Sequence, residues 1–155
     1  MQNIFDEKTY RYLRQRIENL QPDAIRQFGK MNIAQMFAHC DNQLKVAIGT
    51  LKVADETTFV RRNIIRRILP YINTIPKGTE TSDSLKVTDV RQFETEKKKL
   101  LDNLEAVYKR GIKADWHPHP AFGKMSGREW AHLMALHLDH HLHQFHNLEK
   151  TEKLN

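Results

Sequence analysis

Histidine is the residue type in this chain with the most potential for chemistry. The chain has nine histidines, and eight of them lie between His117 and His146. If the residues around position 140 form a helix, His137 and His141 lie about 40° apart on the apolar stripe that contains Trp130. Two imidazoles at positions i and i+4 project from one face, which is the spacing of helical metal sites.

Burial of this pair admits two explanations. An imidazole nitrogen that is buried without a partner costs roughly 1–3 kcal/mol. A divalent metal would satisfy His137 and His141 together. The alternative is a pair of core histidines that are satisfied by hydrogen bonds or water.

The same helical arithmetic places the other polar residues of this segment. His132, His143 and His146 fall on the opposite side from the apolar stripe, and His140 lies at its edge. Gln144 shares the His137 face, so it could orient a ligand or substrate.

A third metal ligand would come from another helix, and His39 is the only histidine in the first 116 residues. His39 borders the apolar face of its predicted helix, a position that suits a side chain leaning across a helix interface. The alternative is an ordinary boundary histidine. Its neighbour Cys40 points at the core, where a free cysteine behaves as a small hydrophobe.

Other groups for catalysis are harder to place. His117 and His119 precede the last helix in a proline-containing segment, and they could supply a fourth ligand or a proton relay, or lie at the surface. No carboxylate is predicted near the histidines, because Asp139 points away from His137 and Asp41 lies about 200° from His39 on its helix.

Helical patterns cover most of the chain, and no segment has the pattern of a strand. Asp6 and Asn32 suit N-caps, Ser126 and Glu129 form a capping box, and Gly111 suits a helix C-terminus. The predicted helices span residues 7–20, 33–51, 57–69, 89–110 and 127–149. The pattern predicts an all-α fold, a four-helix bundle with one extra short helix.

Residues 71–88 form the longest predicted connection. This stretch contains Pro76 and Gly78, has little periodicity, and reads as a long crossover loop. Loops of this length in small domains are uncommon and often functional, for example as a lid over a site.

Length and composition favour one globular domain over residues 1–155. Hydrophobic residues make up 39% of the chain and charged residues 28%, which excludes a disordered or membrane-embedded protein. No apolar run approaches the roughly 20 residues of a membrane span. Residues 1–5 lack the features of a signal peptide, and there is a single cysteine. We therefore expect a soluble, cytoplasmic protein.

The chain is basic, with a formal charge of +6 and a pI of about 9.5, which favours an anionic partner. The densest basic cluster is Arg61, Arg62, Arg66 and Arg67. It reads either as the solvated face of an amphipathic helix or as a nucleic-acid surface. No nucleic-acid motif or interleaved aromatic residue accompanies it, so we do not expect a nucleic-acid partner.

Several motifs together resemble the DinB/YfiT-like superfamily. The segment from His137 to Gln144 is similar to its C-terminal helix motif, His-x-x-His-His-x-x-Gln. Residues 31–39 are similar to its second helix, which ends in the first metal histidine. The segments 119–123 (His-Pro-Ala-Phe-Gly) and 76–78 resemble a branch of the superfamily without a characterised activity. The resemblance spans about residues 5–148.

This resemblance implies a four-helix bundle of the DinB/YfiT-like type with a divalent metal on His39, His137 and His141. Some relatives are thiol-dependent S-transferases or isomerases, and others are metal-dependent hydrolases. The chain differs from the common superfamily pattern in having Leu142 and His143 before Gln144, where Arg-Gly is frequent.

We therefore predict a metalloenzyme that acts on a small molecule, either a hydrolase or a thiol-dependent S-transferase using a low-molecular-weight thiol. Three histidine ligands leave an open position on Zn or Ni, or on Mn or Fe as the next choices. Gln144 and His119 are the candidates for residues around the ligands. A non-catalytic metal- or ligand-binding bundle and, less favoured, a basic nucleic-acid-associated protein are the alternatives. The oligomeric state stays open, with a homodimer as one alternative, because bundles with apolar faces often pair.

Overall fold

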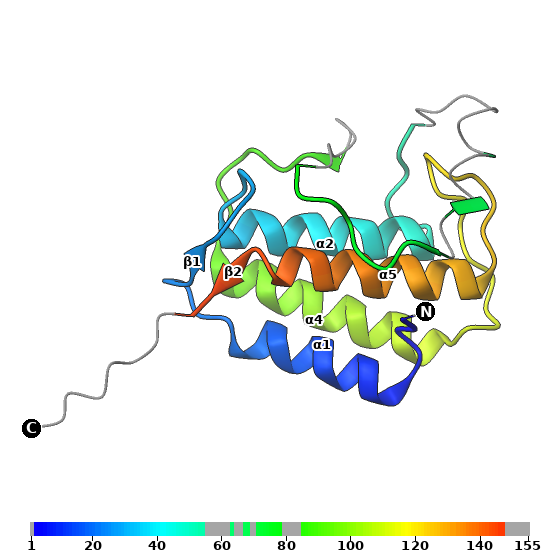
Figure 1. The fold of residues 1–155 in the computed structure, drawn as a ribbon, viewed down its shortest axis with the longest axis horizontal. Helices are drawn as coiled ribbons and strands as arrows, with labels where there is room; N and C mark the ends of the chain where they lie inside the picture. The colour runs from blue at the N-terminus through cyan, green and yellow to red at the C-terminus, as the bar shows by residue number, and fades with distance from the viewer. Residues whose placement is uncertain (1, 55–62, 64–66, 69–70, 79–84, 148–155) are drawn as a thin grey trace, which may run out of the picture.

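Helices make up most of the part of the chain that the computed structural model describes, which is residues 2–54, 63, 67–68, 71–78 and 85–147 (Figure 1). The helices and strands, in chain order, are α1 (Glu7–Asn19), β1 (Ile25–Arg26), α2 (Ile33–Ile48), α4 (Phe93–Arg110), α5 (Gly127–Leu142) and β2 (Phe145–His146).

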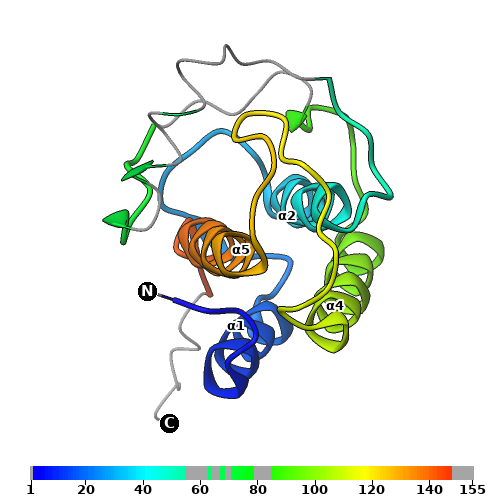
Figure 2. The ribbon, with the colours of Figure 1, turned by 90° about the vertical axis from the view of Figure 1, so that its right-hand side faces the viewer.

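The four helices pack side by side around one core. Helix α2 packs against α4 and α5, and α1 packs against the same two helices. Viewed along their axes, the helices occupy the corners of a bundle (Figure 2). This arrangement confirms the predicted all-α four-helix bundle, in which amphipathic helices bury their apolar stripes against one another.

The helices begin where the sequence predicts caps. The Asp6 side chain accepts a hydrogen bond from the Thr9 amide at 3.0 Å. Asn32 starts α2 and Ser126 starts α5, and each forms a reciprocal capping box with the residue three positions later. These caps satisfy amide groups that have no partner inside the helix.

Two helix boundaries differ from the prediction. Helix α2 ends at Ile48 rather than near residue 51, because Gly49 adopts a left-handed conformation (φ +82°) and its amide bonds back to Lys45 and Val46. Such a glycine C-cap stops a helix. Helix α4 begins at Phe93, after Gln92, rather than directly after Asp89.

The end of α5 is the largest correction. The helix stops at Leu142, whereas the periodicity predicted a helix to about residue 149. The chain then turns, and Phe145 pairs antiparallel with Arg26, so that β2 lies beside β1 (Figure 1). The prediction of no strands was wrong for these two short segments. Strands of two residues are too short to show an alternating pattern.

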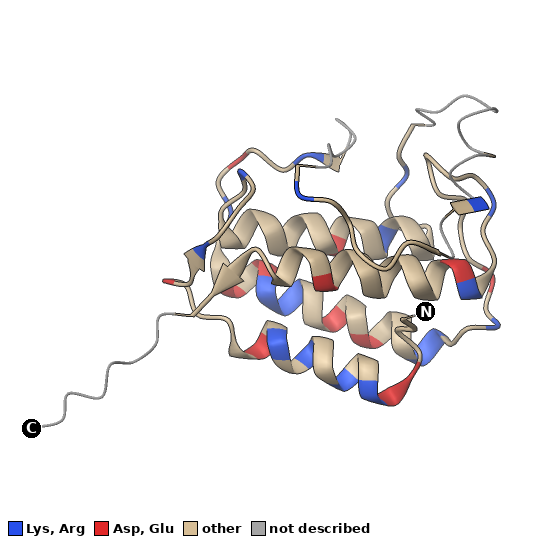
Figure 3. Cartoon of the chain, viewed as in Figure 1, with Lys and Arg blue, Asp and Glu red and all other residues tan. Residues whose placement is uncertain are grey.

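The core draws on all four helices. Its largest fully buried side chains include Leu13 from α1, Phe37 from α2, Leu104 from α4 and Trp130 from α5. The charged residues gather on α1 and α4, while α2 and α5 show few of them (Figure 3). The two helices that carry the histidine motifs are therefore the two weakly charged ones.

Several predictions fall wholly or partly outside the described residues. Most of the predicted helix over 57–69 lies there, as do Arg61, Arg62 and Arg66; Arg67 is described and exposed. Of the 71–88 connection, residues 79–84 lie outside it too, and a lid role stays a prediction. No helix in the described segments is long and apolar enough to cross a membrane.

Truncation of the core should destabilise the bundle. Leu104 is fully buried, so Leu104→Ala is expected to lower the free energy of unfolding by about 2–5 kcal/mol through lost burial and a residual cavity. Urea denaturation followed by circular dichroism measures this change. Val90→Ala is the control: this side chain is 90% exposed, and its substitution should change stability by less than about 0.5 kcal/mol. Equal losses in both variants would contradict this description of the core.

Candidate metal centre

Three histidines converge at the interface between α2 and α5. His39 comes from α2, and His137 and His141 come from consecutive turns of α5. Each offers a nitrogen, and these three nitrogens all lie within 4.8 Å of one another. Two nitrogens bound to one zinc ion at the usual 2.0–2.1 Å would lie about 3–4 Å apart. The spacing therefore fits a single ion with small adjustments.

His39 is oriented by a backbone carbonyl. Its Nδ1 lies 3.0 Å from the Leu85 carbonyl oxygen. Because a carbonyl only accepts, Nδ1 carries the proton and donates, which leaves the lone pair on Nε2. The His39 side chain is 2% exposed, and its Nε2 lies 2.9 Å from Nε2 of His137. The lone pair on His39 Nε2 therefore faces His137.

His141 is oriented in the same way by an amide side chain. Its Nδ1 donates to Oε1 of Gln144 at 2.9 Å, and both residues are buried. This hydrogen bond leaves the His141 lone pair on Nε2. Partners of this kind fix the tautomer and direction of metal-binding histidines in proteins.

His137 stands between these two and lacks an outer partner. Its Nδ1 is buried without a hydrogen-bond partner in the described part of the chain. Its Nε2 faces the lone pair of His39 Nε2 at 2.9 Å, and two neutral nitrogens repel at this distance unless a proton or a cation lies between them. A proton on His137 Nε2 would remove the repulsion between His137 and His39, but it would leave the lone pair of His141 without a partner. A divalent cation would bind all three nitrogens, so the three histidines fit a metal.

Burial keeps the three imidazoles neutral. It lowers the pKa of His39, and it lowers the pKa of His141 to about 3, helped by the neighbouring His39. The pKa of His137 lies well below its usual value, through burial first and then through the charges that His141 and His39 would carry. Metal ligands must be deprotonated, so protons would compete weakly for this site near pH 7.

No carboxylate joins the three histidines among the described residues. As predicted, Asp139 points away and pairs with Arg16 at 3.0 Å. Asp41 is 1% exposed, but it is bound by Lys45 at 2.5 Å and by the Asn103 amide at 2.6 Å. Both aspartates therefore tie helices together.

Cys40 is a core residue, as the sequence predicted. It is fully buried beside Met36, and burial raises the pKa of its thiol. A protonated, enclosed thiol is neither a nucleophile nor a metal ligand.

The histidines outside the cluster follow the helical prediction except for His132. His143 and His146 are exposed, and His140 lies partly buried against Phe28, with 5.6 Å between the ring centroids. His132 was expected at the surface but is 1% exposed. The carbonyl oxygens of Gln2 and Ile72 lie 3.2 and 2.8 Å from its two ring nitrogens, so segments distant in sequence cover that face of α5.

The two loop histidines differ in their surroundings. His117 is exposed, and its backbone joins α2 to α5 by bonding to the Ala47 carbonyl and the Trp130 side chain, both at 3.0 Å. His119 is buried, and burial lowers its pKa to about 4. Its Nδ1 accepts hydrogen bonds from the amides of Ala121 and Phe122, so that nitrogen is not available to a metal.

A glycine that the sequence did not indicate lies against Gln144, the hydrogen-bond partner of His141. Gly29 has a φ of +84°, and a Cβ atom there would lie 2.7 Å from Nε2 of Gln144. A side chain at this position would therefore push Gln144 away from His141. The Leu85 carbonyl was missed as well. Neither contact has a local sequence signal, because each joins segments far apart in the chain.

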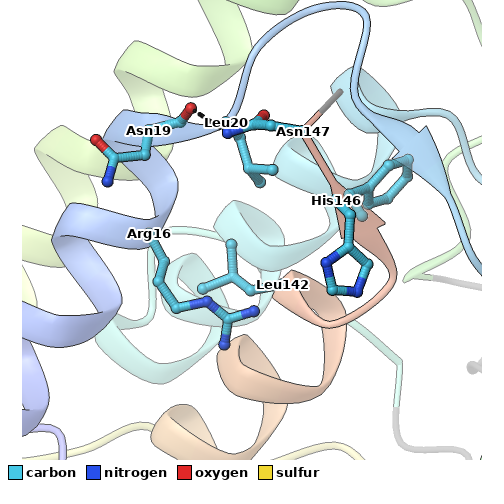
Figure 4. Close-up of a pocket in the computed structure, with 7 residues that line it drawn as sticks. Arg16, Asn19, Leu20, Leu142, His146 and Asn147 are labelled. Atoms are coloured by element: carbon cyan, nitrogen blue, oxygen red, sulfur yellow. Dashed lines mark hydrogen bonds between the residues drawn. The ribbon is translucent and has the colours of Figure 1, made fainter. Parts of the chain in front are cut away.

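A surface cavity lies away from the histidine cluster, between the C-terminal end of α1 and β2 (Figure 4). The Asn147 amide donates to the Asn19 carbonyl at 2.8 Å there, and Arg16 is held by Asp139. None of the three clustered histidines lines this cavity, and two of its polar side chains, Arg16 and Asn147, are held by contacts within the protein, so the histidine cluster is the stronger candidate site.

The chain belongs to the DUF1569 family, whose model matches residues 8–148 and whose description is a protein of unknown function. The match covers α2, α4 and α5, all of α1 except its first residue, and the three clustered histidines. No curated protein and no solved structure matches the chain significantly.

Gln144 should tune metal affinity without contacting the metal. Gln144→Leu removes the acceptor for His141 Nδ1 and is expected to weaken zinc binding about 10–100-fold. Gln144→Glu retains an acceptor and should keep most of the affinity. Competition with a chromophoric chelator measures both constants. Equal affinities in the parent and the leucine variant would show that His141 does not need this hydrogen bond.

His119 should make the fold sensitive to acid. Its folded pKa of about 4 lies below the unfolded value of 6.5, so the unfolded chain binds more protons between these values. The free energy of unfolding should therefore fall as pH drops from 6.5 to 4, by up to about 3 kcal/mol from this residue. Urea denaturation of metal-free protein across this range should show a shallower fall in His119→Asn, and an unchanged slope would contradict the assignment.

Proposed function

We propose that this protein is a metal-dependent enzyme of the DinB/YfiT-like superfamily that acts on a small molecule, either as a hydrolase or as a thiol-dependent S-transferase. His39, His137 and His141 would hold one divalent ion. Zinc or nickel suits three neutral imidazoles best, and manganese or iron comes next.

The observation that carries this proposal is the convergence of three imidazoles from two helices, two of them oriented by outer partners. Leu85 and Gln144 take the outer protons of His39 and His141, and the inner nitrogens of both rings are left as acceptors in one small volume. Ordinary core histidines do not need two fixed acceptor nitrogens beside a third imidazole. A site held from outside in this way is typical of metal binding.

Three protein ligands favour a catalytic centre over a structural one, because structural zinc sites usually have four. A bound metal supplies a Lewis acid and lowers the pKa of a water or thiol at its open position. The protein contributes two fixed imidazoles and weakly charged helices around them. His137 is the partly exposed member of the cluster, so we expect substrate to approach from its side.

A non-catalytic metal-binding bundle is the second candidate function. The lack of a carboxylate in the cluster of described residues supports it, because no nearby aspartate or glutamate serves as a base. His119 is disfavoured as a fourth metal ligand, because its Nδ1 already accepts two backbone hydrogen bonds. The homodimer and the cytoplasmic location stay predictions, and so does the absence of a nucleic-acid partner.

Metal content tests the site directly. Untagged protein incubated with zinc, nickel or manganese should retain close to one ion per chain by elemental mass spectrometry. His137→Ala should lose it, and His143→Ala should retain it, because His143 lies on the same stretch but is exposed and outside the cluster. Circular dichroism checks that each variant folds. A parent that retains no metal would refute the proposed site.

The two reaction types are separated by their need for a thiol. Metal-loaded protein is assayed against ester and amide substrates without thiol, and against electrophiles with a low-molecular-weight thiol. A hydrolase turns over without thiol, whereas an S-transferase depends on its concentration. Activity in either assay should be lost in His137→Ala and kept in His143→Ala. Metal binding without activity in both assays would favour the non-catalytic bundle.

A further inference from the structure

Two of the three clustered histidines have an outer hydrogen-bond partner, and His137 does not. The Leu85 carbonyl accepts from Nδ1 of His39. The side-chain oxygen of Gln144 accepts from Nδ1 of His141. Nδ1 of His137 is buried without a partner among the described residues. A metal on Nε2 of His137 would place the single proton of the neutral ring on Nδ1. Metal binding would therefore create a buried N–H donor that needs an acceptor.

A matching acceptor is buried on the facing helix. Gln43 of α2 is 5% exposed, and its Oε1 atom is buried without a hydrogen-bond partner in the part of the chain that the structure describes. Besides this oxygen and Nδ1 of His137, the unpaired buried side-chain atoms there include only Nε1 of Trp116. An indole N–H can only donate. Gln43 therefore offers the one acceptor among these three atoms.

The contacts at the two ends of the α2–α5 interface show that these helices run antiparallel. The Ala47 carbonyl, near the end of α2, accepts from the amide of His117, which precedes α5, at 3.0 Å. Gly29, which precedes α2, lies against Gln144, which follows α5. A step along α2 from residue 39 toward its end is therefore a step toward the start of α5.

This order places Gln43 on the His137 side of the cluster. Gln43 follows His39 by four residues, so their side chains share one face of α2, with Cβ atoms about 5–6 Å apart. His137 meets His39 across the interface, with 2.9 Å between the Nε2 atoms, and lies one turn closer to the start of α5 than His141. Helix side chains tilt toward the N-terminus of their own helix. In antiparallel helices, Gln43 and His137 therefore tilt toward each other.

We propose that Gln43 is a positioning residue for His137: when a metal occupies Nε2 of His137, Oε1 of Gln43 accepts a hydrogen bond from Nδ1–H, directly or through one water. This inference rests on the proposed metal site. An acceptor at this position fixes the imidazole ring and raises the basicity of the nitrogen that binds the metal. Gln43 therefore strengthens metal binding without contacting the metal.

The proposal also bears on the charge of the site. With Gln43 in this role, each of the three imidazoles donates to one uncharged oxygen, from Leu85, Gln144 and Gln43. Neutral ligands with neutral partners leave the charge of a divalent ion uncompensated. Such a centre favours an anionic ligand, such as a hydroxide or a thiolate, at its open position.

Substitutions of Gln43 separate this role from packing. Gln43→Met keeps the length of the side chain and removes the acceptor, whereas Gln43→Glu keeps an acceptor oxygen. Gln15→Met makes the same change at an exposed position of α1 and is the control. Zinc affinity of the full-length proteins is measured by competition with a chromophoric chelator, and the stability of the metal-free proteins is measured by urea denaturation.

Gln43→Met is expected to bind zinc about 10–100-fold more weakly than the parent. Gln43→Glu and Gln15→Met should bind it no more than about threefold more weakly. Without metal the Gln43 oxygen is unpaired, so the urea midpoint of metal-free Gln43→Met should equal or exceed that of the parent. A lower midpoint with unchanged zinc affinity would show a packing role and overturn the inference, while leaving the metal site intact. A parent that binds no zinc would refute the metal site and this inference together.

The contact can also be observed without any variant. A crystal structure of the zinc-loaded parent should place Nδ1 of His137 within about 3.2 Å of Oε1 of Gln43, or should show both atoms bonded to one water. A different acceptor at Nδ1 would overturn the inference even if every variant failed to fold. Zinc bound by Gln43 itself would overturn it as well.

Discussion

The contact between His39 and His137 across the α2–α5 interface is the constraint on which the site depends. Their Nε2 atoms lie 2.9 Å apart, in a bundle interior that keeps both rings neutral. Two lone pairs cannot face each other so closely without something positive between them. Because α2 and α5 carry few charged residues (Figure 3), no protein cation takes that place in the cluster of described residues, and a proton or a metal must.

Segments outside the four helices orient the other nitrogens of this cluster. The Leu85 carbonyl approaches His39 from the connection before α4, and Gln144 reaches His141 from the turn that follows α5. The turn, the short β1–β2 pair and Gly29 together hold the amide against the imidazole. The segment that follows α5 therefore also orients one of the three clustered histidines.

The site has two sides of different character. On the inner side, His39 and His141 are buried and held by fixed partners. On the outer side, His137 is partly exposed. The family to which the chain belongs has no assigned function, so the three-histidine cluster itself is the best guide to one.

The sequence by itself determined where the helices begin and which histidines of α5 share a face. Helix starts follow from caps at Asp6, Asn32 and Ser126, and the i, i+4 spacing places His137 and His141 on one buried face, because both depend on neighbours within one or two turns. The tertiary structure decided what depends on distant segments. It buried His132 under residues 2 and 72, ended α5 by pairing β2 with β1, and brought Leu85 and Gly29 to the histidines. Backbone carbonyls and close approaches between remote segments have no residue-type signal, so only the folded chain reveals them.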